Sequence, residues 1–480
     1  MRPLTSRCRD RALASLAAAP GRIEQLDQFL ASVQSAPADT PKNGTGFDLP
    51  IALGLLMATG QLPATAGAGL IAVGELGLDG SIRPVPGALP FARHAAKPAG
   101  RTLVLPIDNV AEGALVSAAR LAAPPTLAVM VEWLRRDRLP LADRTSAGGQ
   151  PVRLSDVDFA DVVGQEAAKR ALEVAAAGGH NVLLLGPPGA GKTMLARRLP
   201  TILPPLTEPE ALEVIAVRSV AGLFALEESM PPPRPFRAPH HTVSGAGLLG
   251  GGSAPRPGEV SLAHHGVLFL DEFLEFPRTV LDGLRQPMED GRVVIARARG
   301  SVVYPARFTL VAAANPCPCG HAGNPRGSCC CTPAAVARYR ARLSGPLADR
   351  IDVHVTLTAV PLPALASRGP STSSEEMRQR VQAARARQLG RYGDGASGRA
   401  TCNAHASGRS LEARGAMRRE ARDLLTAAAE RLGLSARGYH RVMRVARTIA
   451  DLEGAESVGV PAVAEALRYR PTEGALRGMH

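Results

Sequence analysis

One glycine-rich stretch constrains the fold of this chain more than any other. Four apolar residues, Val182–Leu185, precede a turn with two prolines and three glycines, and a helix-like stretch follows it. An apolar run of this length is typical of a central strand in a parallel sheet. The spacing G-x-x-x-x-G-K-[ST] between a strand and a helix is that of a phosphate-binding loop. We therefore expect a nucleoside triphosphate site formed by Gly186, Pro187, Pro188, Gly189, Ala190, Gly191, Lys192 and Thr193.

The residue types of this loop indicate how it would bind phosphate. Its glycines let backbone N–H groups converge on phosphate oxygens at the start of a helix. Lys192 can reach the β- and γ-phosphates, and the Thr193 hydroxyl can bind Mg²⁺. A chance glycine-rich turn is the alternative, and the flanking strand and helix argue against it.

Composition narrows the class of protein. The 480 residues suggest about two to four domains, and a hydrophobic content of 45% is enough for sizeable cores. No apolar run is long and uncharged enough to span a bilayer, so we expect no membrane association. Asp10 and Arg11 interrupt the apolar segment that a signal peptide needs. We expect a cytoplasmic enzyme, whose seven cysteines form no disulfide framework.

The chain is strongly basic. Its net charge is +13, and only four of its 56 basic residues are lysines. This charge is compatible with a polyanionic partner such as nucleic acid. It is equally compatible with a basic, solvated surface, and composition alone does not decide between the two.

A second apolar strand ends in two carboxylates. Gly266–Leu270 is followed directly by Asp271 and Glu272. Asp271 would lie beside Mg²⁺, and Glu272 would polarise the attacking water, because hydrolysis needs a base near the γ-phosphate. An acidic pair at a strand end can also cap a helix, but its combination with the phosphate loop favours ATP hydrolysis.

These segments together resemble the ATPase core of AAA+ proteins. An arginine-finger residue in that class stabilises charge developing on the γ-phosphate of the neighbouring subunit's ATP. A surface salt bridge with Asp349 or Asp352 is the alternative for the arginine concerned here. The site residues that the resemblance implies are Val163 and Gly164 on the adenine side, Asn315 as the first sensor, Arg350 as the arginine finger and Arg437 as the second sensor.

The region before these segments is similar to the proteolytic domain of Lon-type proteases. The similarity rests on Gly74–Val85, and Leu70–Leu76 is expected to form a strand. Lon proteases use a Ser–Lys dyad, which needs both partners. Here Gly46 stands at the serine position and Leu89 or a neighbour at the lysine position, so we expect a Lon-like fold without peptidase activity. An unrelated small α/β domain is the alternative.

The parts in this order resemble the YifB/ComM family of magnesium-chelatase-like AAA+ ATPases. The resemblance implies a hexameric ring with ATP sites between subunits and activity on DNA, as a branch-migration motor or helicase in recombination or natural transformation. Residues 1–32 do not match the usual start of the family, which leaves a truncated or misassigned start open. The match runs from about Val33 to Tyr469, and its most specific segments are Gly178–Asn181, Arg234–His241, Gly258–His264 and Tyr304–Phe308.

We therefore expect an α/β protein: an AAA+ P-loop ATPase core with a helical lid, preceded by a Lon-protease-like α+β domain. A Gly-, Ser- and Pro-rich stretch marks a linker between the first two parts. The expected divisions are residues 1–134 for the Lon-like domain (with 1–32 unplaced), 135–153 for the linker, 154–365 for the ATPase core and 366–480 for a lid of the magnesium-chelatase C-terminal type.

Two insertions in the expected core point towards DNA. Thr242–Ser261 is glycine-rich and looks like an insert that points into the pore of related rings. Asp290–Gly300 predicts a β-hairpin, in which Arg292, Arg297 and Arg299 can contact phosphates. An exposed hairpin with solvated charges is the alternative.

A cysteine cluster follows Asn315. Two C-x-C pairs, Cys317/Cys319 and Cys329/Cys331, flank a loop rich in glycine. Four thiolates can hold Zn²⁺ tetrahedrally, although C-x-C is less typical than C-x₂-C, and free thiols are the alternative. The pairs His240/His241 and His264/His265 are interpreted as residues of the core rather than metal ligands.

The sequence thus predicts an ATP- and Mg²⁺-dependent homo-hexameric motor that acts on single-stranded or branched DNA. A magnesium-chelatase-type ATPase subunit and an ATP-dependent unfoldase without peptidase activity are the alternatives. Stimulation of ATP hydrolysis by forked or four-way DNA would distinguish the first from the others.

Overall fold

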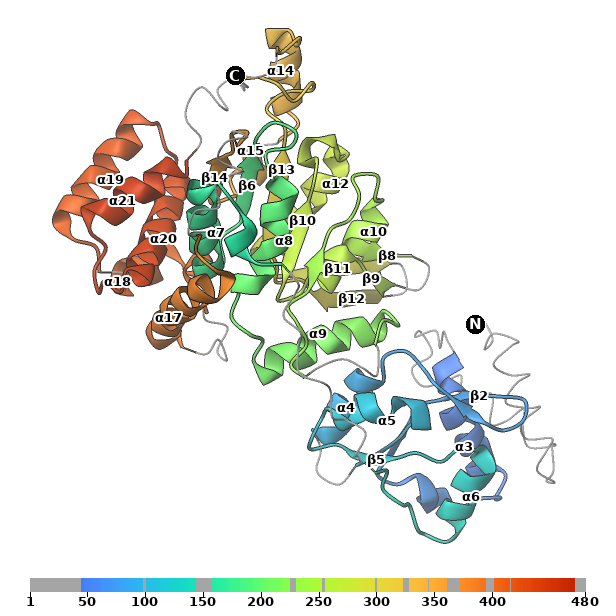
Figure 1. Cartoon of the computed structure of the whole chain (residues 1–480). Helices are drawn as coiled ribbons and strands as arrows, with labels where there is room; N and C mark the ends of the chain where they lie inside the picture. The colour runs from blue at the N-terminus through green and yellow to red at the C-terminus, as the bar shows by residue number, and fades with distance from the viewer. Residues whose placement is uncertain are drawn as a thin grey trace.

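The computed structural model describes residues 45–97, 101–143, 157–224, 230–252, 255–297, 300–322, 328–343, 345–360, 371–393, 401–414 and 416–470. The described chain forms an N-terminal α/β part, a central parallel sheet flanked by helices, and a C-terminal group of helices (Figure 1). The α/β core and helical lid expected from the sequence are confirmed.

The N-terminal part is built on a three-stranded parallel sheet in the order β1-β4-β5. A short antiparallel hairpin, β2–β3, lies outside this sheet. Its elements are α3 (Asp48–Ala58), β1 (Leu70–Ala72), β2 (Glu75–Leu76), β3 (Ile82–Arg83), α4 (Ala88–Ala96), β4 (Thr102–Val104), α5 (Val110–Ala114), β5 (Arg120–Ala122) and α6 (Leu127–Arg135).

The single strand expected over Leu70–Leu76 is wrong, because the chain leaves one sheet and enters another within it. Val73 and Gly74 separate β1 from β2. The Gly74 N–H donates to the Gly46 carbonyl (3.0 Å), and a Cβ at Gly74 would lie 2.8 Å from Ile82 Cγ2. Only glycine allows this close approach, and the apolar pattern alone does not reveal the change of sheet.

The ATPase core contains a five-stranded sheet in the order β14-β6-β13-β10-β7, in which every neighbouring pair is parallel. The central strands read as apolar runs because helices cover both faces of the sheet. Val182–Leu184, all of β10 and Leu310–Ala314 are buried. The strands are β6 (Val182–Leu185), β7 (Phe236–Arg237), β10 (Val267–Leu270), β13 (Thr309–Ala314) and β14 (Val353–Thr356).

Helices of the core and lid pack on this sheet and share one hydrophobic cluster with it. In the lid, Arg447 and Asp451 are almost fully buried and form an ion pair of 3.0 Å. The core helices are α7 (Glu166–Gly178), α8 (Lys192–Ile202) and α9 (Glu208–Val220), and the lid helices are α17 (Ser374–Tyr392), α18 (Gly408–Arg414), α19 (Arg419–Arg431), α20 (Ala436–Leu452) and α21 (Val460–Arg468).

Helix α9 also connects the N-terminal part to the core. It lies between the two in Figure 1, and the Gly87 N–H, at the start of α4, donates to the Ser219 carbonyl (3.1 Å). Within the described residues, no helix combines the length and the apolar character needed to cross a membrane.

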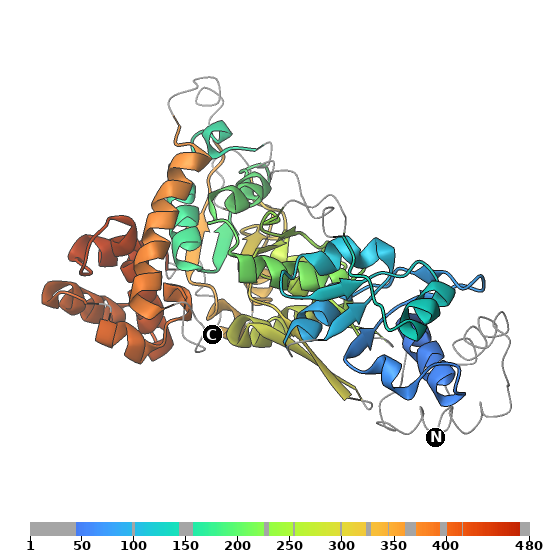
Figure 2. The same ribbon diagram turned by 90° about the horizontal axis from the view of Figure 1, so that it is seen from below.

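The two insertions form one projecting unit. A hairpin is present, but it is longer than the expected Asp290–Gly300. Its strands are β11 (Arg292–Arg297) and β12 (Gly300–Pro305), and it extends from the core in Figure 2. The first insertion forms α10 (Gly245–Leu249), the strands β8 (Gly250–Gly251) and β9 (Arg256–Pro257), and α11 (Glu259–Leu262). The Tyr304 hydroxyl of β12 donates to the Pro255 carbonyl (2.9 Å), which joins the two insertions.

Candidate active site

The phosphate loop connects β6 to α8, as its sequence predicts. Gly189 and Gly191 have φ angles of +77° and +87°, conformations that glycine adopts without strain. A Cβ at Gly186 would lie 2.9 Å from the Leu357 carbonyl oxygen, so this glycine allows the loop to pass close to the backbone that follows β14. The loop is thus built at the carboxyl end of β6, where parallel sheets bind their ligands.

Lys192 lies inside this loop. Its ammonium group donates to the carbonyl oxygens of Gly186 (2.6 Å) and Pro187 (3.0 Å) and to Asn315 Oδ1 (3.0 Å). Burial lowers the pKa of Lys192, and the nearby carboxylates Asp271 and Glu272 oppose this effect. A desolvated ammonium whose partners are mostly neutral carbonyls is suited to exchange them for phosphate oxygens.

The expected magnesium ligands meet at the carboxyl end of β10, which is separated from β6 by β13. The Thr193 hydroxyl donates to Asp271 Oδ2 (2.7 Å), although the two residues come from α8 and from the end of β10. The other carboxylate oxygen, Asp271 Oδ1, accepts from the Glu272 N–H (3.0 Å). A hydroxyl and a carboxylate are the oxygen ligands that Mg²⁺ uses beside nucleotide phosphates, so these residues fit the ion.

Glu272 has a histidine partner that sequence reasoning missed. His241 Nδ1 lies 3.0 Å from Glu272 Oε2. Glu272 itself has a φ of +49°, which is uncommon for a residue other than glycine. Its side chain is 55% exposed, as access to an attacking water requires. The sequence signal for this pair is the His240/His241 doublet, which the sequence alone does not link to the acidic pair.

The adenine-side segment is tied to the phosphate loop by a residue that we did not assign to the site. Gln165 is buried, and its amide donates to the carbonyl oxygens of Ala190 (3.2 Å) and Thr358 (2.9 Å). Val163 and Gly164 precede it directly, and Gly164 has a φ of +72°.

Arg350 and Arg437 lie near the amino ends of the parallel strands, whereas the phosphate loop lies at their carboxyl ends. Asn181, directly before β6, donates its side-chain amide to the Arg350 carbonyl (3.0 Å), whereas the loop follows β6. Four strand residues span about 13 Å. Arg350 pairs with Glu289, rather than with the Asp349 or Asp352 considered above.

The two arginines line one cavity of about 580 Å³. Three further arginines line the same cavity. Arg307 lies just before β13, and Arg441 and Arg444 belong to α20. Arg441 forms an ion pair with Asp349 (2.8 Å), which fixes α20 against the segment before β14. No residue of the phosphate loop is among the residues that line this cavity.

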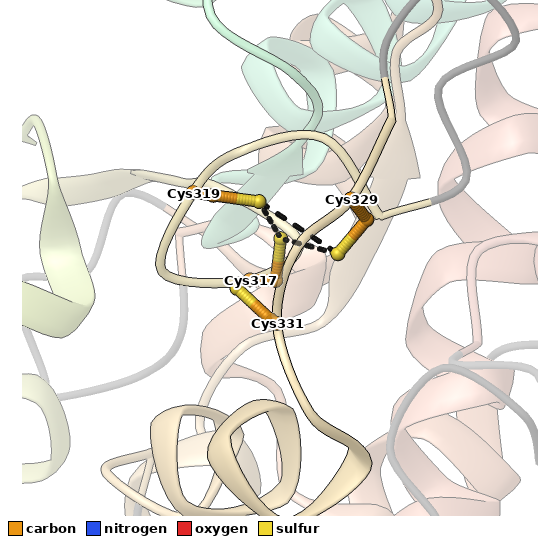
Figure 3. Close-up of side chains that lie close together, drawn as sticks. All are labelled: Cys317, Cys319, Cys329 and Cys331. Atoms are coloured by element: carbon orange, nitrogen blue, oxygen red, sulfur yellow. Dashed lines mark hydrogen bonds between the residues drawn. The ribbon is translucent and has the colours of Figure 1, made fainter.

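The four predicted cysteines converge. The sulfur of Cys317 lies 3.4 Å from that of Cys319 and 3.7 Å from that of Cys329, and Cys319 and Cys329 are 3.7 Å apart (Figure 3). All four sulfurs, including that of Cys331, lie within 4.8 Å of one another. Zn–S bonds of about 2.3 Å in a tetrahedron place sulfurs about 3.8 Å apart, so the donor set fits zinc.

The arginines expected to contact DNA are only partly described. Arg292 is exposed at the base of the hairpin, on the same side as Val294, which is 39% exposed. The backbone of Arg297 ends β11, and Arg299 lies outside the described residues.

The second histidine pair surrounds the carboxylate of Glu213. His264 and His265 each place Nε2 at hydrogen-bond distance from Glu213 Oε2 (3.0 and 2.9 Å), and the Arg307 N–H donates to His264 Nδ1 (3.0 Å). These bonds hold the pKa of Glu213 well below its usual range. The cluster therefore joins α9 to the end of α11 as a structural contact.

In the Lon-like part, the two positions considered for a dyad are apolar. Leu89 is fully buried in α4, and its N–H donates to Glu112 Oε1 (2.9 Å). Gly46 lies against Val73 and Val85.

Comparisons with known proteins agree with this architecture. The family model "Magnesium chelatase, subunit ChlI" matches residues 158–365, and its C-terminal companion matches residues 371–470. A third model, "Subunit ChlI of Mg-chelatase", matches residues 10–109 and so reaches into the first 32 residues. Fold, site and models define an ATP-binding AAA+ protein of the magnesium-chelatase type, a class that uses ATP with Mg²⁺.

Similarity to individual proteins assigns the chain to one family within this class. The chain is 43% identical to competence protein ComM of Haemophilus influenzae over 92% of its own length and 85% of that protein. It is 42% identical to YifB of Escherichia coli over 92% of its length and 84% of that protein. A partial similarity, 32% identity over 29% of the chain, links it to Lon protease 2 of Bacillus subtilis, of which it covers 26%. The chain belongs to the ComM/YifB family.

Proposed function

We propose that this protein is a ring-forming ATPase motor that acts on DNA, in branch migration or strand separation. The observation that carries the proposal is the separation of the site residues over the two edges of one sheet. Lys192, Asp271 and Asn315 lie at the carboxyl ends of the strands, whereas Arg350 and Arg437 lie at the amino ends.

This separation supports hydrolysis between subunits. An arginine about one strand length from its own phosphate loop is too far away to stabilise charge on its own ATP. A neighbouring subunit in a closed ring can bring the same arginine to that site, as heterologous interfaces do. A homo-hexamer is the assembly that we propose, in line with the AAA+ class.

The projecting hairpin supports DNA as the partner. Its exposed side carries Arg292 beside Val294, with Val303 as the cross-strand partner of Val294. Val303 is 53% exposed, so the hairpin offers both a cation and apolar contact area to a ligand. Arginines bind phosphates through charge, and apolar side chains can contact the sugar and base surfaces of an opened strand.

Two other functions, a peptidase and a chelatase-type subunit, are the alternatives. Gly46 has no side chain and Leu89 is buried and apolar, which supports our proposal that the Lon-like part is not a peptidase. ATP-dependent cleavage of a protein substrate would contradict it. The chelatase-type alternative predicts hydrolysis that is indifferent to DNA.

The test is ATP hydrolysis by the full chain with and without forked DNA. We expect forked or four-way DNA to stimulate hydrolysis severalfold, because a DNA motor couples its ATP cycle to its track. Glu272→Gln keeps the shape of the side chain but removes the base, so it should lower kcat by at least about a hundredfold while ATP still binds. Hydrolysis without DNA stimulation, together with no DNA binding, would favour the chelatase-type alternative.

We further propose that Cys317, Cys319, Cys329 and Cys331 bind one zinc ion. The separations of their sulfurs and the absence of a better explanation for four converging thiols among the described residues support it. Zinc is a structural ion when four protein sulfurs complete its shell. Metal analysis of the purified protein, with the expected result of one zinc per chain, tests this proposal.

A further inference from the structure

The cysteine cluster lies directly beside the ATP site. Asn315, which accepts the hydrogen bond from Lys192, directly follows β13, and Cys317 comes two residues later. The Gly320 N–H donates to the Cys317 carbonyl (3.0 Å) and closes a tight turn, which we name the cysteine turn, Cys317–Gly320. A displacement of this turn would therefore move Asn315, which is only two peptide bonds away.

The cysteine turn also contacts the phosphate loop. Gly320 has a φ of +82°, and a Cβ built on it would lie 2.6 Å from Pro188 Cδ and 3.9 Å from Asn315 Cγ. Pro188 is one of the two prolines at the centre of the phosphate loop. The backbone of the turn thus packs against the loop, and glycine is needed both for its conformation and for this approach.

The second cysteine pair lies just before helix α14 (Pro333–Arg340), and the last residue of that helix contacts Pro316 beside the cysteine turn. Cys331 precedes Thr332, the N-cap of α14, whose hydroxyl accepts from the Ala335 N–H (3.2 Å). At the other end of α14, the Arg340 side chain donates to the Pro316 carbonyl (3.2 Å). Bonds between the four sulfurs and one ion would close this arrangement into a rigid loop around Pro316.

Apolar packing contributes little to holding the cluster together. Cys317 is buried, but Cys319 and Cys331 are half-buried and Cys329 is exposed. Exposed sulfurs gain little from burial, whereas bonds to a structural zinc ion supply most of the folding free energy of small metal-bound loops.

We propose that the zinc-bound cysteine turn is a positioning element of the ATP site, which holds Pro188 of the phosphate loop and Asn315 in their working geometry. This inference rests on the proposed zinc site. It assigns Gly320 as a positioning residue: Gly320 touches no substrate, and acts through its contact with Pro188. Loss of zinc, by chelation or by oxidation of the thiols, then weakens ATP use at a site that contains no cysteine.

The experiment compares four variants of the full chain for zinc content, affinity for a non-hydrolysable ATP analogue, and kcat. The double variant Cys329→Ser/Cys331→Ser should lose zinc, bind the analogue more weakly and hydrolyse ATP about ten- to a hundredfold more slowly, the range that a misplacement of about 1 Å produces. Cys330→Ser is the matched control, because Cys330 lies between them but outside the cluster. It should keep zinc and full activity.

Gly320→Ala separates zinc binding from positioning. It retains all four sulfurs and should keep one zinc per chain, yet its Cβ displaces Pro188, so analogue affinity and kcat should fall as in the double variant. Gly60→Ala is its control, since Gly60 has a similar φ of +71° with nothing within 4 Å of the added Cβ. A protein without zinc overturns the zinc site and this role together. Zinc binding with unchanged ATP affinity and kcat in Gly320→Ala overturns the positioning role alone, and leaves the proposed DNA motor in place.

Discussion

Glu272 combines an uncommon backbone conformation with a histidine partner. A left-handed conformation costs roughly 1–2 kcal/mol for a residue with a Cβ, and such cost is found where a side chain must be aimed. His241 Nδ1, 3.0 Å from Glu272 Oε2, fixes the direction of the carboxylate. The ring of His241 itself packs edge-on against Phe276, with centroids 6.4 Å apart. His241 is therefore a residue that positions the proposed base.

Replacement of His241 tests this role. In His241→Ala the carboxylate of Glu272 loses its partner, and we expect kcat to fall about tenfold with little change in KM for ATP, because the phosphate contacts remain. The matched control is His240→Ala. His240 is the neighbouring exposed histidine. Its ring packs against that of His241, with centroids 4.1 Å apart, but its Nδ1 contacts Thr242 rather than the base. Equal effects of the two substitutions would indicate a general disturbance of the segment.

At the scale of elements, the hairpin β11–β12 is the clearest unexplained projection of the core. Val293 and Ile295 face inward and are buried, while Arg292 and Val294 on the alternate side are exposed. This alternation is that of a strand with one packed and one free side. Because the first insertion supports the packed side through Pro255 and Tyr304, the free side remains available to a ligand.

Salt dependence measures how many phosphates the hairpin contacts. We expect Arg292→Ala/Arg297→Ala to weaken binding of forked DNA and to reduce the slope of log K against log [salt] by about one per arginine removed. The control Arg419→Ala removes one charge at Arg419 of α19, whose side chain is 92% exposed, so the change in slope per charge removed is compared between the two variants. If the change in slope per charge of the hairpin variant equals that of the control, the hairpin does not contact the phosphates.

At the scale of the whole molecule, the proposed site residues of one subunit fall into two separate groups. The phosphate loop and the acidic pair lie at one edge of the sheet, and the cavity with Arg350 and Arg437 lies at the other. In the single chain Arg350 forms a salt bridge to Glu289, while its buried Nε has no hydrogen-bond partner among the described residues. If Arg350 acts on a neighbour's ATP as proposed, this salt bridge would be exchanged for the phosphate. Assembly would therefore be linked to hydrolysis.

A mixing experiment distinguishes action between subunits from action within one. Lys192→Ala and Arg350→Ala should each hydrolyse ATP at least about a hundredfold more slowly than the unaltered protein. When the two inactive proteins are mixed, some interfaces combine an intact phosphate loop from one with an intact arginine from the other, so part of the activity should return. If Arg350 acts within its own subunit, every mixed ring contains only defective sites, and no activity returns.

The sequence by itself determined the parts of the site that local patterns encode. The apolar run of β6, the glycine spacing of the loop and the carboxylates after β10 each depend on neighbours within about ten residues. The structure places Thr193 against Asp271 and Lys192 against Asn315 accordingly, because the ends of neighbouring parallel strands meet at one edge. The same local logic predicted a hairpin that contains β11 but not most of β12, whereas the α/β core with its helical lid was implied by the family resemblance and is confirmed.

Only the tertiary structure decided which residues meet over long separations. It paired His241 with Glu272, divided Leu70–Leu76 between two sheets, and set Arg350 and Arg437 around a cavity away from the phosphate loop. Such contacts depend on the order and direction of the strands, which residue spacing does not contain. The phosphate loop is thus a property of the sequence. Its contact with the cysteine turn, and the distance of Arg350 from it that underlies the proposed role of a neighbour's arginine, follow from how the chain is folded.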